Sequence, residues 1–458
     1  MKVVICGAGQ VGFGIAERLS AQKHDVTVID NSNDLIANIS NNLDVRGIVG
    51  NGSFPDVLMQ GGAEEADIIL AVTQADEVNM VICQIAHTLF NIPTKIARIR
   101  SSSYLNPEYN SIFSSDNIPI DVIISPEIEI GESILRNLML PGAFEIIQFG
   151  DKLISLIGVT LNNDCPVVDT PLSQLSNLFP NLNAVVVAIH RNGKIIVPHN
   201  DEQMSYGDQI YLVCETAHVE RTLSLLGHTE PSAHNLVIAG AGNIGKYVAK
   251  NLELNDKNAN IKLIESNKEK AEIAAKELKN SLVIHGDVLD RGIMIEAGVD
   301  QADTFIALTN EENINLLSSV MAKELGSKQT LSLLIDKNYI DLQSKLEIDK
   351  FINPRETTIS SILRYLRKGR IRDAHSLCDG DAEIIEAEVL ESSPLLGKFI
   401  KDCELPNDVR IGSILRGGCV IKPNGDIRIE LHDRVVIFCL SNVIHDVEQL
   451  FRVSLEYF

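Results

Sequence analysis

Near its start the chain has the sequence Lys2-Val3-Val4-Ile5-Cys6-Gly7-Ala8-Gly9-Gln10-Val11-Gly12, an apolar run that leads into a glycine-rich turn. The turn has GxGxxG spacing, and a second copy, Gly240-Ala241-Gly242-Asn243-Ile244-Gly245, follows another apolar run 233 residues later. One such hexapeptide is weak evidence, because glycine triplets arise by chance. Two copies, each between a predicted strand and a predicted helix, indicate a duplicated dinucleotide-binding unit.

The similarity continues along both halves of the chain. Residues 7–19 and 240–252 are identical at six of thirteen positions. A Ser-Ile-Leu-Arg run occurs at 133–136 and again at 361–364. We therefore predict two halves of the same design.

Residues 1–124 alternate short apolar runs with helical patterns, which predicts a Rossmann-like, doubly wound parallel sheet. The predicted strands are Val3–Cys6, Val26–Ile29, Ile68–Val72, Lys95–Ile99 and Val122–Ile124, and the predicted helices include Gly12–Ala21 and Val78–Thr88. Residues 234–352 repeat the scheme. The fold class is therefore α/β, with two such sheets.

Each half then changes to a strand-rich pattern with turn signals, which predicts a small α+β domain after each Rossmann-like domain. The expected order is a Rossmann-like domain at 1–124, a crossover helix at 125–143, a small domain at 144–226, a linker at 227–233, a second Rossmann-like domain at 234–352, a second crossover helix at 353–375 and a second small domain at 376–458.

The glycine spacing is suited to a pyrophosphate. The first glycine allows the tight turn, the second lets the backbone approach the phosphates, and the third allows close packing of helix on strand. The helix that follows presents unpaired N–H groups and a partial positive charge. We therefore predict cofactor contacts from both turns, at Gly7, Ala8, Gly9, Gln10, Val11, Gly12, Gly240, Ala241, Gly242, Asn243, Ile244 and Gly245. The alternative is a glycine turn that binds nothing.

A carboxylate ends the strand after each turn. Asp30 lies 18 residues after Gly12, and Glu265 lies 20 residues after Gly245. Such a carboxylate accepts both ribose hydroxyls of an adenosine and repels a 2′-phosphate. NAD(H), or another plain adenosine nucleotide such as ATP, is therefore favoured over NADP. At each position, a solvated strand-end cap is the alternative.

The next strands of the first half supply further candidates. Thr73, followed by Gln74, ends the strand predicted at Ile68–Val72, at the edge where ligands bind in open α/β sheets. Arg98 or Arg100, in the strand after it, can donate to a phosphate.

The second half repeats the threonine as Thr309 but not the arginines. Its matching strand has the sequence Ser332-Leu333-Leu334-Ile335, which contains no cation. We therefore expect the second cleft to hold a polyphosphate less tightly than the first, or differently.

Composition excludes several function classes. The formal net charge of −22 disfavours nucleic acid and anionic lipid as direct partners. Apolar runs such as Val435–Leu440 are far shorter than the ~18 residues that cross a bilayer. Eight cysteines without metal-like spacing, and a strand rather than a signal peptide at the N-terminus, favour a reducing cytoplasm.

No catalytic constellation is evident, and no metal site is predicted. The acidic turn at 379–383 is interpreted as a simple turn rather than a cation site. The alternative function is an NAD-dependent oxidoreductase with duplicated domains, which would show turnover of NADH. A redox-sensing transcriptional repressor is disfavoured by the acidic charge.

The duplicated GAGxxG unit, the AVTxxDExN segment at 71–79, the Pro-Glu helix at 126–136 and the repeated small domain resemble a known architecture. It is the tandem regulator-of-potassium-conductance (RCK) arrangement and, more narrowly, the TrkA family of bacterial Trk potassium uptake systems. The resemblance covers essentially the whole chain.

The resemblance implies a non-enzymatic regulatory subunit that binds NAD(H), with ATP or ADP as further ligands. It implies a cytoplasmic homotetrameric ring, docked under a separate potassium-translocating membrane protein, with segment 125–130 crossing between subunits. It also places Asp30, Thr73, Arg98 and Glu265 among the nucleotide contacts.

Overall fold

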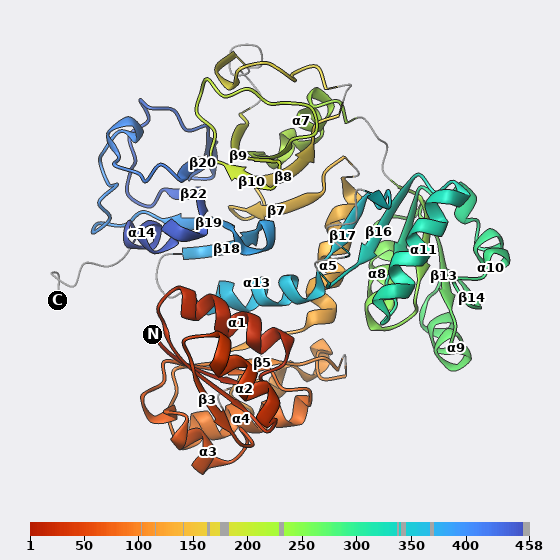
Figure 1. Cartoon of the computed structure of the whole chain (residues 1–458), viewed down its shortest axis with the longest axis horizontal. Helices are drawn as coiled ribbons and strands as arrows, with labels where there is room; N and C mark the ends of the chain where they lie inside the picture. Colours follow the sequence, from red (N-terminus) through yellow and green to blue (C-terminus); the bar gives the residue numbers. More distant parts are fainter. Residues whose placement is uncertain are drawn as a thin grey trace. The chain divides into compact units, whose positions relative to one another are not determined.

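The computed structural model divides the chain into two compact units, each built from both halves. The first unit comprises Met1–Ile134 with His234–Leu366, and the second Leu135–Ala233 with Arg367–Phe458. The structure describes residues 1–101, 103–114, 116–140, 142–162, 165–174, 183–228, 233–336, 339, 345–366 and 371–451. Most of the predicted linker therefore lies outside the described residues. Figure 1 labels the helices and strands.

The first half of the first unit is a six-stranded parallel sheet in the order β3-β2-β1-β4-β5-β6. Its strands are β1 (Lys2–Cys6), β2 (Asp25–Asp30), β3 (Arg46–Val49), β4 (Ile68–Ala71), β5 (Thr94–Arg98) and β6 (Val122–Ile124). Its helices are α1 (Gln10–Ala21), α2 (Asn33–Asn42), α3 (Pro55–Gln60), α4 (Asp76–Thr88) and α5 (Pro126–Met139). The predicted α/β fold class is confirmed.

The second half repeats this sheet in the order β14-β13-β12-β15-β16-β17. Its strands are β12 (Asn235–Ala239), β13 (Asn260–Glu265), β14 (Leu282–His285), β15 (Thr304–Ala307), β16 (Gln329–Leu333) and β17 (Lys350–Ile352). Its helices are α8 (Asn243–Asn255), α9 (Lys268–Glu277), α10 (Arg291–Glu296), α11 (Glu312–Leu325) and α13 (Pro354–Leu366).

Within the two parallel sheets, the strands β3 and β14 were not predicted from the sequence. Each lies at the edge of its sheet and pairs with only one neighbour. Edge strands are short and less buried, so their apolar pattern is weak: β3 has no fully buried residue and β14 has one.

The second unit contains two antiparallel sheets. One has the order β10-β9-β11-β8-β7, and the other β18-β19-β22-β20-β21. The first is built from β7 (Glu145–Phe149), β8 (Ile154–Thr160), β9 (Val185–Arg191), β10 (Lys194–Ile196) and β11 (Gln209–Glu215), followed by α7 (Val219–Leu225). The second is built from β18 (Ile371–Leu377), β19 (Ala382–Glu388), β20 (Val409–Arg416), β21 (Cys419–Ile421) and β22 (Arg434–Leu440), followed by α14 (Ile444–Gln449).

The second crossover segment differs from the helix expected over 353–375. Helix α13 ends at Leu366, and β18 begins at Ile371 within that range. Residues 371–375 extend because they pair antiparallel with β19, a long-range contact that the local pattern does not reveal.

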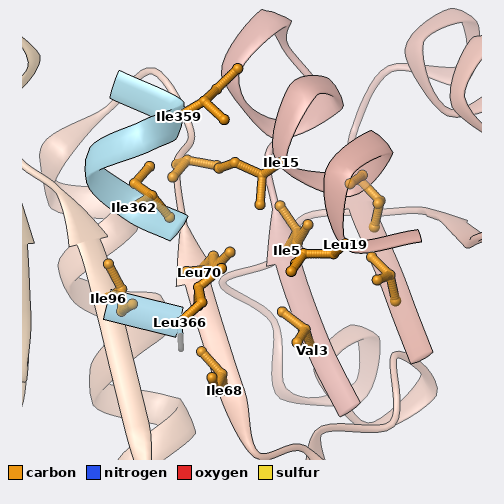
Figure 2. Close-up of a cluster of buried hydrophobic side chains, with 14 of the residues drawn as sticks. Val3, Ile5, Ile15, Leu19, Ile68, Leu70, Ile96, Ile359, Ile362 and Leu366 are labelled. Carbon is orange, nitrogen blue, oxygen red and sulfur yellow. The ribbon is translucent and has the colours of Figure 1, made fainter. Parts of the chain in front are cut away.

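The helix after each parallel sheet packs on the other half of the chain. Ile359, Ile362 and Leu366 of α13 are fully buried in one cluster with Ile15 of α1 and strand residues such as Leu70 (Figure 2). Figure 1 draws α13 beside α1. In the opposite direction, Glu132 of α5 accepts a hydrogen bond from the hydroxyl of Tyr247 in α8. The helices α5 and α13, here called the exchanged helices, therefore cross between the halves of one chain.

Two candidate nucleotide clefts

The first glycine turn has a backbone that only glycine can adopt without strain. Gly7 has a φ of +117°, and a Cβ there would lie 2.9 Å from the carbonyl of Val72. A Cβ on Gly12 would lie 1.8 Å from the carbonyl oxygen of Gly7. Gly240 and Gly245 repeat this geometry, with a φ of +101° and a Cβ-to-oxygen distance of 2.0 Å. Both turns are therefore built for close packing of helix on strand.

The middle glycine of each turn faces open space instead. A Cβ on Gly9 or Gly242 would meet no atom within 4 Å. Each precedes a helix, α1 or α8, as an extended N-cap residue without a side-chain capping bond. The described residues therefore leave room beside each N-cap glycine, where a pyrophosphate could approach the N–H groups that begin the helix.

The predicted carboxylates are tied to the glycine turns. Asp30 accepts hydrogen bonds from the N–H of Ala8 at 2.7 Å and of Ser32 at 2.9 Å. Glu265 accepts from Ala241 at 2.8 Å and from the N–H of Asn267 at 2.9 Å. A carboxylate has about four acceptor positions, so lone pairs remain on each group for ribose hydroxyls.

A buried asparagine organises the neighbouring strand ends. Asn79, fully buried, accepts from the backbone N–H of Thr73 at 2.9 Å and from its hydroxyl at 2.7 Å. Its amide donates to the carbonyl of Arg98 at 2.8 Å. Asn315 makes the same contacts to Thr309 and Leu333. The sequence signal was available, because the two asparagines correspond in the repeat, but their role was missed.

Arg98 is the last residue of β5 and reaches Thr73, which follows the end of β4. Its Nη2 donates to the carbonyl of Thr73 at 2.7 Å, while its buried Nε has no hydrogen-bond partner among the described residues. Burial, reinforced by the nearby charge of Arg100, lowers the pKa of the Arg98 guanidinium. An anionic ligand would restore charge balance and occupy free donors there.

Arg100, the other candidate in this strand, is directed elsewhere. Its Nε pairs with Glu127 of α5 at 2.9 Å. Its backbone N–H, with that of Ser101, donates to Asp76 at the start of α4. Of the two arginines, Arg98 is therefore the better phosphate candidate.

The predicted site residues of the first half converge on one sheet edge. The glycine turn, Asp30, Thr73 and Arg98 follow or end the adjacent strands β1, β2, β4 and β5, whose carboxyl ends meet at the same edge. Gln74 is exposed beside Thr73. In the second half Leu333 occupies the place of Arg98 and is almost fully buried. The two clefts thus share their turn, carboxylate and asparagine and differ in the cation.

Among the residues that the structure describes, no group of three or more His, Cys, Asp or Glu side chains could hold a metal ion. No helix in that part of the chain is both long and apolar enough to cross a membrane.

Comparison with known proteins places the chain in a family. The TrkA-N domain model matches residues 3–126 and 236–354, and the TrkA-C domain model matches 156–227 and 384–452. The chain is 52% identical, over the full length of both proteins, to the Trk system potassium uptake protein TrkA of Azorhizobium caulinodans. It is 37% identical to that of Halomonas elongata, again over the full length of both.

Solved structures share the fold at lower identity. The GsuK RCK domain superposes with a TM-score of 0.61 at 15% identity, covering 98% of this chain and 94% of the other. A GsuK channel bound to NAD gives a TM-score of 0.60 at 14% identity, with 98% and 78% covered. The duplicated clefts, the small domains that follow them and these full-length matches agree. The chain therefore belongs to the TrkA family of Trk potassium uptake proteins.

Proposed function

We propose that this protein is a non-enzymatic regulatory subunit that binds adenosine nucleotides in two unlike clefts and gates a separate potassium-translocating membrane protein. The observation that carries the proposal is the repeated cleft. In both copies an open helix N-terminus stands beside a carboxylate anchored to the glycine turn. Binding without turnover suffices for regulation, so catalytic residues are unnecessary.

The clefts suggest how each nucleotide is held. The pyrophosphate lies against the N–H groups that begin α1 or α8, and the adenosine ribose donates to Asp30 or Glu265. Arg98 adds a donor for a phosphate in the first cleft only. NAD(H) therefore suits both clefts, while ATP or ADP gains most in the first.

Gating requires that the nucleotide binds two arrangements of the assembly with different affinity. We infer a homotetrameric ring on the cytoplasmic face, attached through the membrane partner rather than to lipid. Membership of the TrkA family of Trk potassium uptake proteins supports the membrane partner in this arrangement. In this scheme a nucleotide that binds one arrangement of the assembly more tightly than the other favours that arrangement. The open fraction of the pore then changes according to the ratio of the two affinities.

Calorimetric titration of the purified chain with NADH, NAD, ATP and ADP tests the proposal. We expect two sites per chain of unequal preference and no consumption of NADH. Asp30→Ala and Glu265→Ala should each abolish tight binding at one site and spare the other. Binding to neither cleft, or steady NADH consumption with a carbonyl substrate, would overturn the proposal, the latter in favour of an oxidoreductase.

A further inference from the structure

The exchanged helices make two contacts of opposite steric character. Where α13 meets α1, a Cβ on Gly14 would lie 2.3 Å from Cδ1 of Ile359. Where α5 meets α8, a Cβ on Gly131 would lie 2.3 Å from Cδ1 of Tyr247. The bulky side chain thus belongs to the exchanged helix in one contact and to the helix after the glycine turn in the other.

The repeat makes these four positions equivalent in pairs. Gly14 and Tyr247 both lie seven residues after the first glycine of their turn, and Ile359 and Gly131 both lie five residues after the proline that begins their helix. Equivalent positions of the two halves therefore carry opposite sizes. Each contact fits because it joins unlike halves.

Polar contacts at the same two interfaces are also unlike. Arg18 of α1 pairs with Glu356 of α13 at 2.5 Å, whereas their equivalents in the other interface are Asn251 and Ile128. The Tyr247 hydroxyl donates to Glu132 at 2.6 Å, a bond that Gly14 cannot make. Neither bond can form between two like halves.

We propose that the Gly14–Ile359 and Gly131–Tyr247 contacts specify pairing of the first Rossmann-like domain with the second and reject pairing of like domains from two copies of the chain. Two first halves would bring Gly14 against Gly131 and leave a gap, with Arg18 facing Ile128. Two second halves would drive Tyr247 into Ile359. A gap on one side and a collision on the other act together against exchange between copies.

This pairing has a consequence for the clefts. Each pair of Rossmann-like domains contains one cleft with Arg98 and one with Leu333. If like domains paired, an assembly would contain pairs with two arginine clefts and pairs with none. Pairing of unlike domains, as the Gly14–Ile359 and Gly131–Tyr247 contacts specify it, therefore keeps two unlike clefts in every pair, whichever nucleotides they bind.

Cysteine cross-linking in the full chain tests the rule. The parent for this test carries Arg18→Cys in α1 and Ile128→Cys in α5. The two thiols should face one another only when α1 of one copy meets α5 of another copy. Cys419→Ser removes the exposed native thiol. This parent loses the Arg18–Glu356 pair but keeps the Gly14–Ile359 and Gly131–Tyr247 contacts, and a short bismaleimide should give little covalent dimer on a denaturing gel. Adding Gly131→Ile and Tyr247→Gly gives both interfaces the same glycine–isoleucine contact, and the covalent dimer should rise several-fold.

Two milder variants keep the test decisive if that change impairs folding. Tyr247→Ala removes the collision with Ile359, together with the ring beside Gly131 and its hydroxyl, and should raise the covalent dimer to a smaller extent. Tyr247→Phe keeps the ring and loses only the hydrogen bond to Glu132, so its covalent dimer should stay well below that of Tyr247→Ala. Well-folded variants, judged by unchanged melting, with no more dimer than the parent would overturn the proposal, as would an equal rise with Tyr247→Phe.

Discussion

The two clefts share the groups proposed to face the ribose and pyrophosphate, which adenosine nucleotides have in common. They differ at one strand-end position proposed to face a further phosphate. Both have the glycine turn, the open helix N-terminus and an asparagine that ties two strand ends. At the end of β5 the first cleft has a cation, Arg98, whereas the matching position at the end of β16 in the second is Leu333. Duplication preserved the parts that would hold ribose and pyrophosphate in the proposed function. Selectivity could then diverge through one residue at a strand end.

The largest expected effect is a difference in stability between alanine substitutions at two glycines of the first turn, Gly12 and Gly9. Gly12→Ala places a Cβ 1.8 Å from a backbone oxygen, so we expect a loss of about 4 kcal/mol or more in the stability of the first Rossmann-like domain. Gly9→Ala meets open space and should cost about 1 kcal/mol or less, while weakening nucleotide binding. Denaturant midpoints measure both, and equal midpoints would refute the assigned roles.

Removal of the Asp30 carboxylate should weaken nucleotide binding in the first cleft and leave binding in the second unchanged. Asp30→Ala loses the acceptor for ribose and for the Ala8 N–H, so affinity at the first site should fall by about 3 kcal/mol, roughly 100-fold. The second site provides the internal control in the same titration. An equal loss of affinity at both sites, or no loss at either, would show that Asp30 does not contact the nucleotide.

Arg98→Leu should make the first cleft resemble the second. We expect ATP affinity at the first site to fall by about 2 kcal/mol, roughly 30-fold, because a charged donor to phosphate is lost. Arg100→Leu is the matched control, since Arg100 pairs with Glu127. If the control weakens ATP binding more than Arg98→Leu does, the phosphate contact has been assigned to the wrong arginine.

A smaller, pH-dependent difference is expected in the second sheet. Burial opposes ionisation of Asp303, but N–H groups of Asn235 and His234 and the Lys328 ammonium together lower the pKa of Asp303 to about 2. A lowered carboxyl pKa stabilises the fold above the unfolded value of about 4, and this contribution is lost as the pH falls towards 2. Asp303→Asn should therefore cost about 1 to 2 kcal/mol at pH 7 and progressively less at pH 4 and 3, in urea unfolding. A cost that does not change over this range would contradict the assignment.

Local patterns predicted most of the strands of the two parallel sheets, both turns and the carboxylates, because each depends on neighbours in the chain. A side chain at Gly7 would be strained and would clash with nearby backbone, so the position requires glycine. The GxGxxG spacing is the sequence signal of that requirement. Asp30 follows from the length of one helix and one strand. The weak edge strand β3 was missed because its stability comes from a single neighbour, β2, rather than from its own pattern.

The sequence by itself determined that this protein has two Rossmann-like domains with nucleotide-type turns, and that only the first has a strand-end arginine. Only the tertiary structure decided that α13 packs on the first sheet, that Asn79 joins Thr73 to β5, and that Arg98 rather than Arg100 faces the strand ends. The physical reason is range. Turn sterics act between residues a few positions apart, whereas the partner of an apolar helix face or a buried amide is set by whichever surface, hundreds of residues away, buries it best.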